Sequence, residues 1–252
     1  MLNKVKTLKG YKLDSLDGEI GKVKEFYFDD QHWTIRYLVA DTGHWLTGRK
    51  VLISPYALNS VIKSEKHLSV NLTKKQIENS PSLASHKPVS QQFEDDYYGY
   101  YGWPSYWSGA SVWGDYPYIE RDQTKWGTHT KAAKSWDRHL RSTHEVTGYH
   151  LETLDGELGH IEDFVIDDAS WAIRYLIVKT QNWWPGKSVL VSPQWIERVS
   201  WSEKKVFISL SRETIKTSPE YTEESLLTRD YEIGLHGHYS RKGYWIDERV
   251  AA

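Results

Sequence analysis

The chain has 252 residues, a formal net charge of −2 and no cysteine. This length suits one large domain or two small ones, and the absence of cysteine excludes disulfides, thiolate zinc sites and a cysteine nucleophile. The near-neutral charge argues against a protein that binds duplex nucleic acid. No apolar run approaches the ~20 residues that span a bilayer, and the N-terminal segment lacks the apolar core of a signal peptide. We therefore expect a cytoplasmic protein without a transmembrane segment.

The first predicted element is a hairpin at Asp17-Gly18, because glycine tolerates the positive φ of a tight turn. A strand is expected over residues 21–28, and Asp29-Asp30 then form a turn. Both faces of the next strand, residues 33–40, are largely apolar, so it should be covered on both sides. That pattern suits a closed barrel with another segment packed outside it.

A short strand over residues 51–54 ends at Pro55, which cannot continue a ladder of hydrogen bonds. A hairpin is expected over residues 61–72, and Thr73 begins a short helix with the capping-box pattern. The dipeptide Ser80-Pro81 ends that helix. Five or six short strands and one helix in about 75 residues predict a small β-barrel.

The whole pattern occurs a second time, 138 positions later. Leu16-Asp17-Gly18-Glu19 aligns with Leu154-Asp155-Gly156-Glu157, and Trp-x-Ile-Arg-Tyr-Leu occurs at 33–38 and at 171–176. From residue 10 to residue 81 no gap is needed and about 40% of positions are identical, which is far above chance for a self-comparison. In the second copy Ser211 alone supplies the helix cap.

The alignment continues into a segment rich in tyrosine and tryptophan, which we call the arm. Residues 93–107 align with residues 231–245, so each arm belongs to its repeat. We expect each arm to be extended, ordered and packed on a barrel, either its own or that of the other copy, because large rings bury enough apolar area to offset the ordering of a short segment. The expected organisation is a first unit over 1–107, a linker over 108–144 and a second unit over 145–252, with the barrels packed as a pseudo-twofold pair.

Each copy resembles the PRC-barrel family. The resemblance rests on LDGEIGKVKEFYFDD, WTIRYLVADT and VLISPYAL in the first copy, and on LDGELGHIEDFVIDD, WAIRYLIVKT and VLVSPQWI in the second. It implies a mainly β protein of two tandem small barrels, each with a short helix and an aromatic arm. Family members include the cytoplasmic domain of the photosynthetic reaction-centre H subunit and the C-terminal domain of the bacterial ribosome maturation factor. The membrane helix of the former and the RNA-facing domain of the latter have no counterpart here.

Arg36 and Arg174 are charged residues in strands otherwise fit for burial. An unpaired buried guanidinium costs several kcal/mol, so each needs a carboxylate partner. We predict structural ion pairs with Asp29 and Asp167 across the preceding turns. The alternative is that each arginine binds an acidic group of another protein.

Two sets of residues invite a metal site. The acidic turns at Asp29-Asp30 and Asp167-Asp168 offer oxygen ligands, but their spacing lacks the pattern of a calcium loop, and a solvated turn explains them. His236 and His238 could hold a transition metal, yet the first arm has tyrosine at both aligned positions. We expect no cofactor and no catalytic centre.

Tryptophans in two loops after the central strands are candidate contact residues, because tryptophan is enriched at interface hot spots. The alternative is that they cap the open end of a barrel. The ends of the arms complete the candidate interaction set, which is Trp45, Trp183, Trp184, Tyr106, Trp107, Tyr244 and Trp245.

These features predict a non-enzymatic scaffold or adaptor, of the tandem kind that the resemblance links to bacteria. Its partners are expected to be proteins and not nucleic acids, and homo-oligomerisation stays open. One alternative is a peripheral accessory of a photosynthetic or electron-transfer complex, as the resemblance to the H subunit implies. Another is a regulator that binds a metal or a small ligand weakly.

Overall fold

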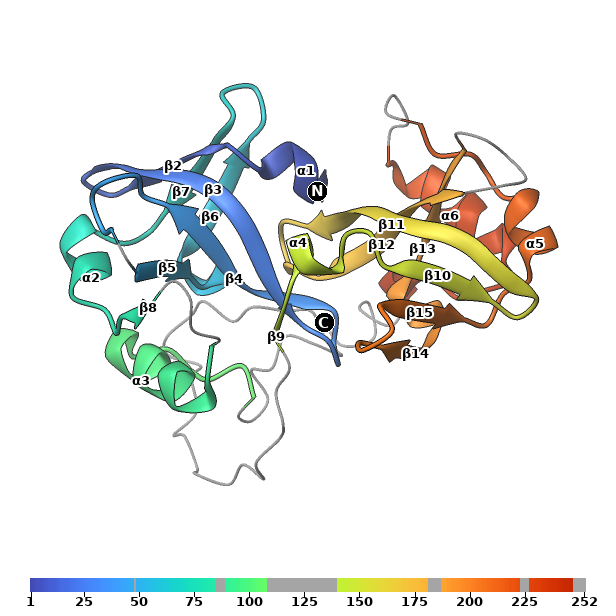
Figure 1. The fold of residues 1–252 in the computed structure, drawn as a ribbon. Helices are drawn as coiled ribbons and strands as arrows, with labels where there is room; N and C mark the ends of the chain where they lie inside the picture. Colours follow the sequence, from blue (N-terminus) through green and yellow to red (C-terminus); the bar gives the residue numbers. More distant parts are fainter. Residues whose placement is uncertain (48, 85–88, 108–139, 181–186, 223–226, 247–252) are drawn as a thin grey trace. The chain divides into compact units, whose positions relative to one another are not determined.

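The chain divides into two compact units, each of which is described by itself. The computed structural model describes residues 1–47, 49–84, 89–107, 140–180, 187–222 and 227–246 (Figure 1). The first unit takes Met1, residues 3–143 and residues 167–172, and the second takes Leu2, residues 144–166 and residues 173–252. Residues 108–139, most of the expected linker, lie outside the described part. None of the helices within the described ranges combines the length and apolarity needed to cross a membrane.

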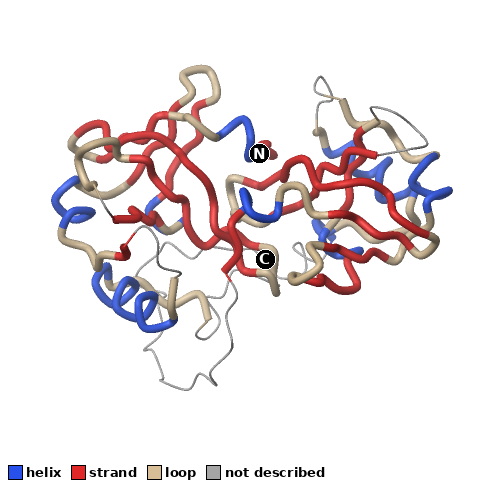
Figure 2. The backbone as a smooth tube through the Cα atoms, in the orientation of Figure 1, coloured by secondary structure: helices blue, strands red, loops and turns tan. Residues whose placement is uncertain are grey.

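Strands predominate in the first repeat (Figure 2). Its expected hairpins and short helix are present, and the helix has the capping box of Thr73 and Gln76 that the sequence predicts. The elements in chain order are β1 (Leu2–Lys4), α1 (Val5–Leu8), β2 (Lys12–Ser15), β3 (Gly18–Asp29), β4 (Thr34–Asp41), β5 (Arg49–Ile53), η1 (Pro55–Ala57), β6 (Leu58–Ile62), β7 (His67–Val70), α2 (Lys74–Glu78), β8 (Leu83–Ala84) and α3 (Gln91–Tyr101).

The second repeat has the same order of elements as far as β15 and its short helix. The side chain of Ser211 caps that helix by accepting a hydrogen bond from Thr214 N, as predicted. The elements are β9 (Leu140–Ser142), α4 (Thr143–Val146), β10 (His150–Thr153), β11 (Gly156–Asp167), β12 (Ile173–Thr180), β13 (Ser188–Val191), η4 (Pro193–Trp195), β14 (Ile196–Ser200), β15 (Lys205–Ile208), α5 (Arg212–Lys216) and α6 (Arg229–His238).

Each sheet is an open path of strands, so the expectation of a closed barrel is corrected for the described residues. In the first unit the order is β6-β7-β2-β3-β4-β5-β8, with β9 pairing with β3 off that path. In the second it is β13-β12-β11-β10-β15-β14. After β5 and β13 the chain makes a 3-10 turn that starts at proline, and β5 pairs with β8 instead of β6.

Both faces of the central strand are covered, as its apolar pattern predicts. Seven of the eight residues of β4 are buried, and so are all but Lys179 in β12. The sequence expectation of an extended arm is wrong for most of its length, because residues 93–101 lie in helix α3 and residues 231–238 lie in helix α6. Ser90 and Thr228 cap their N-termini. Helices satisfy their own backbone groups while covering a sheet, which an isolated extended segment cannot do.

The second glycine of the Asp-Gly-x-x-Gly motif is required by a close approach between strands. A Cβ atom on Gly21 would lie 2.1 Å from Asp41 O, and one on Gly159 would lie 2.0 Å from Lys179 O. Gly21 also has a φ of +132°, which favours glycine. The motif therefore fixes how β3 and β11 pack against the strands that follow them.

We expect Gly21→Ala and Gly159→Ala each to lower the free energy of unfolding by about 1–3 kcal/mol or more, because the backbone that opposes the new methyl group must move. Urea unfolding measures the loss. Gly99→Ala in α3 is the control, since no atom lies within 4 Å of its added Cβ. That control should be neutral or stabilising, by up to ~1 kcal/mol. Equal stability of Gly21→Ala and the wild type would contradict the close approach.

Candidate functional site

Arg36 and Asp29 form a buried ion pair in the first unit. The Arg36 side chain is 0% exposed and its Nε donates a hydrogen bond to Asp29 Oδ2. His32 adds two contacts to Asp29 Oδ1, from its backbone N at 2.7 Å and its Nδ1 at 3.0 Å. Burial alone would raise the pKa of Asp29, but the Arg36 guanidinium and the His32 bonds outweigh it and hold the pKa below its usual range. A fully buried guanidinium is out of reach of another protein, which favours the structural interpretation.

The second arginine shares a contact with the first, since Arg36 Cζ also lies over an arm tyrosine, 4.1 Å from the centroid of the Tyr106 ring. Arg174 is 7% exposed and its Cζ lies 3.8 Å from the centroid of the Tyr244 ring. Asp167 accepts hydrogen bonds from Ala169 N at 3.2 Å and Ser170 Oγ at 3.0 Å. The pairing of Arg174 with Asp167 stays a prediction.

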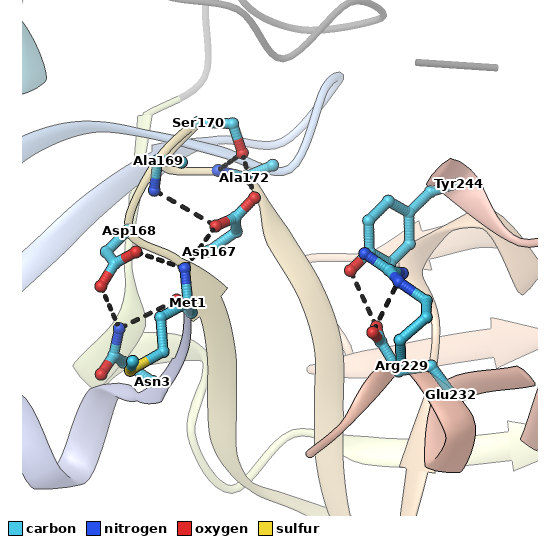
Figure 3. Close-up of polar contacts among 10 residues, drawn as sticks. All are labelled: Met1, Asn3, Asp167, Asp168, Ala169, Ser170, Ala172, Arg229, Glu232 and Tyr244. Carbon is cyan, nitrogen blue, oxygen red and sulfur yellow. Dashed lines mark hydrogen bonds and ion pairs between the residues drawn. The ribbon is translucent and has the colours of Figure 1, made fainter. Parts of the chain in front are cut away.

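The carboxylates of both acidic turns contact cationic or hydrogen-bonding partners within the first unit. Arg141 Nε lies 3.0 Å from Asp30 Oδ2. Asp168 accepts a hydrogen bond from Asn3 Nδ2 at 2.9 Å and lies 2.5 Å from the Met1 amino group, as the left-hand group of residues in Figure 3 shows. Across the described ranges no three histidine, aspartate or glutamate side chains gather as metal ligands would. Protein contacts account for these turn carboxylates.

A buried carboxylate ties the arm of the first unit to its central strand, an arrangement that we call the clamp. Glu94 in α3 is 2% exposed, and its Oε1 accepts hydrogen bonds from Tyr37 Oη of β4 and from Tyr106 Oη, both at 2.9 Å. Burial and the nearby Glu94 carboxylate raise the pKa of Tyr37 well above its usual range, so this hydroxyl keeps its proton and can donate. One carboxylate therefore joins the strand, the helix and the segment after the helix.

The second unit has the same clamp at the aligned positions. Glu232 in α6 accepts from Tyr175 Oη at 2.9 Å and from Tyr244 Oη at 2.8 Å. Arg229 adds an ion pair at 3.0 Å, and the right-hand group of Figure 3 shows Tyr244 and Arg229 converging on Glu232. The sequence alignment paired these glutamates but did not reveal what they bind. A tyrosine on the strand, a glutamate on the arm helix and a tyrosine after that helix are the signal that could have found the clamp.

At one position beside the clamp the two units differ. His236 in α6 is 2% exposed, with its Nε2 3.1 Å from Tyr175 Oη and its Nδ1 3.1 Å from Lys242 O. The aligned residue in the first unit is Tyr98, whose hydroxyl lies 3.4 Å from Ser54 Oγ. Burial lowers the pKa of His236 below 6.5, and Arg229 lowers it further against the opposing bond to Lys242 O.

The candidate interaction residues fall into three groups. Trp45 is half-buried, and Trp183 and Trp184 lie outside the described residues. Tyr106 and Tyr244 are 3% and 7% exposed, so the clamps cover the rings that the sequence suggested as anchors for a partner. The remaining two candidates, Trp107 and Trp245, are half-buried against Tyr98 and His236 respectively, with ring centroids 5.5 Å and 5.0 Å apart.

Comparison with known protein families assigns a domain to the first repeat. A family model for the PRC-barrel domain matches residues 5–77. The chain carries a PRC-barrel domain. The PRC-barrel match extends from α1 into α2 and stops before α3, so the arm and its clamp glutamate lie beyond the matched region, whereas Tyr37 lies within it. A comparison with curated proteins finds no match.

We expect Tyr37→Phe to loosen the arm from the PRC-barrel domain, because the buried Glu94 loses the hydroxyl donor that β4 supplies. Leaving a buried acceptor under-satisfied costs about 1–3 kcal/mol. Hydrogen exchange of the α3 amides measures the docking, and they should exchange faster by the factor that this cost implies. Asp95→Asn on the same helix is the control, since the Asp95 side chain is exposed. Equal protection of α3 in Tyr37→Phe and the wild type would show that the clamp does not hold the arm.

The second unit should lose stability in mild acid. The pKa of His236 is lower in the folded chain than the value of 6.5 that applies when it is unfolded, so the unfolded state binds the proton first as the pH falls. The contribution of His236 to the free energy of unfolding is therefore present above pH 6.5. It is lost as the pH falls from 6.5 through the lowered pKa of the folded state. Thermal melts at about pH 8 and about pH 5.5 measure it. His236→Tyr, which copies the first unit, should remove this part of the pH dependence, and an unchanged dependence in that variant would contradict the assignment.

Proposed function

We propose that this protein is a non-enzymatic protein-interaction scaffold in which each repeat presents an exposed leucine on a fixed hairpin. The proposal extends the PRC-barrel description to the second repeat, and the shared order of elements at an offset of 138 supports that extension. The buried polar groups of the clamps are occupied by one another, which favours a structural role for them over a catalytic one.

The exposed leucines carry the proposal. Leu16 is 65% exposed and Leu154 is 68% exposed, and they occupy the same position at the tips of the β2–β3 and β10–β11 hairpins. Single exposed leucines are ordinary on protein surfaces. Here the same residue protrudes from both copies of a repeat, at a position where it adds little to the core of its own unit.

Both hairpin tips are held in place by an aspartate, so each leucine is displayed on a rigid support. Asp17 Oδ1 accepts hydrogen bonds from Lys74 N at 2.7 Å and Ser15 Oγ at 2.8 Å. Asp155 Oδ1 accepts from Arg212 N and from Thr153 Oγ1, both at 2.8 Å. Bonds from Lys74 N and Arg212 N hold the pKa of Asp17 and Asp155 below the usual range, so both stay ionised near neutral pH. A pre-organised apolar side chain loses little entropy when a partner's pocket closes on it.

We expect Leu16→Ser and Leu154→Ser to leave the thermal melt unchanged and to reduce capture of a partner. The tagged full chain is used to capture proteins from a lysate of the source organism, and the captured proteins are quantified for the wild type, each variant and the double variant. Glu19→Ser on the same hairpin, with its side chain 50% exposed, is the control and should capture as the wild type does. Equal capture by the wild type and the double variant, or no captured protein at all, would contradict the proposal.

A further inference from the structure

Two histidines lie directly opposite each other on the outer face of the β10–β11 hairpin. His150 of β10 is the cross-strand partner of His160 of β11. Residues that oppose each other in an antiparallel pair point to the same face of the sheet. The next residues along, Leu151 and Ile161, are buried, so the histidines point away from the core, with His150 exposed and His160 half-buried.

The local ladder brings these two side chains close. Ile161 N donates to Tyr149 O on one side of the pair, whereas the amide of His150 donates to Lys204 O in the opposite direction. His150 and His160 therefore form a pair without hydrogen bonds between their own backbones. Such pairs have Cα atoms about 4.5 Å apart and the closest side chains of an antiparallel sheet.

A carboxylate orients one of the rings. His150 Nδ1 lies 2.8 Å from Glu157 Oε1. Because an ionised carboxylate only accepts, Nδ1 carries the proton and the lone pair of the neutral ring is on Nε2. A carboxylate that holds the far nitrogen of an imidazole is the usual second layer of a metal site, where it fixes the ring and raises its basicity.

The neighbouring charges are compatible with a cation. Lys205 lies next to His150 on β15, but its Nζ is bonded to Glu152 Oε1 at 2.7 Å. Glu162 is a further acidic residue, two positions beyond His160 on β11. The first unit differs here, because Lys12 and Lys22 are the cross-strand partners at the aligned positions.

We propose that His150 and His160 form a surface site for a divalent transition-metal ion of the class that prefers imidazole, with copper(II) bound more tightly than zinc(II). The protein supplies two nitrogen ligands, Glu157 orients the first of them, and water completes the coordination. This site belongs to the second repeat alone, since a pair of lysines cannot bind a cation. It is independent of the leucine tips and of any partner.

Calorimetric titration of the full chain with Cu²⁺, and separately with Zn²⁺, tests the site. We expect saturable binding of one ion, with the ring resonances of His150 and His160 shifted by Zn²⁺ in NMR spectra. His150→Lys combined with His160→Lys copies the first repeat and should abolish the binding and the shifts. Glu157→Gln should weaken the affinity about 10-fold, because the ring loses its carboxylate.

His44→Lys is the matched control, since His44 is an exposed histidine of the first unit and should not contribute. Binding should also strengthen as the pH rises through the range in which imidazole loses its proton. Saturable binding that persists in the double lysine variant, or that is absent from the wild type, would overturn the proposal. Equal loss of binding in His44→Lys would overturn it as well.

Discussion

A carboxylate buried in the arm of each unit constrains the structure around it. Removing a charged group from water costs several kcal/mol unless hydrogen bonds replace the water. Glu94 and Glu232 each receive hydroxyl donors from two directions, one from the central strand and one from the residues after the arm helix. Both donors must be present to satisfy the carboxylate. The position of the arm helix on the central strand and the position of the residues after that helix are therefore fixed together.

This constraint also explains the composition of the central strands. A strand with two apolar faces would aggregate if one face met water, so it requires a cover. The arms supply that cover, and the rings of the first arm pack against one another, as Tyr101 and Trp103 do with centroids 4.3 Å apart. Tyrosine and tryptophan suit this position because they bring apolar area together with a polar group that can bond at the margin. The surplus of both residues over phenylalanine thus follows from covering a sheet with a short, partly wet helix.

Much of the local structure could be predicted from the sequence. Residue type and periodicity predict the hairpin at Asp17-Gly18, the capping box at Thr73 and the burial of both faces of β4. The need of a buried arginine for a carboxylate predicts the ion pair of Arg36 with Asp29. The two expectations that failed, a closed barrel and an extended arm, depend on tertiary contacts. Strand closure cannot be read from periodicity, because the Ser-Pro turns look alike whether or not the flanking strands pair. The expectation of an extended arm failed because tertiary burial overrides the weak helix propensity of its glycines and tyrosines.

The two copies share the residues that hold the fold together and differ at residues on the surface. Glu94 and Glu232 match, as do Gly21 and Gly159, since a change at either would break packing that both units share. Where packing does not constrain the residue, the two copies differ. Lys12 and Lys22 of the first copy align with His150 and His160 of the second. Duplication of a stable unit gives the second copy freedom to acquire a property that the first lacks.

The parallel pairing of β2 with β7 has a consequence for how each unit folds. This pairing joins Lys12 to His67, and the hydrogen bond between Asp17 and Lys74 spans 57 positions of the chain. A loop of that length must close before either contact can form, and the entropy of closure is lost before the hydrogen bonds compensate for it. Folding of each unit should therefore be slow relative to helical proteins of its size, with the β3–β4 hairpin formed early and the β2–β7 seam formed late. Until the seam forms, the edge of β2 is open, and both β7 and the aligned strand β15 of the other repeat are available to pair with it.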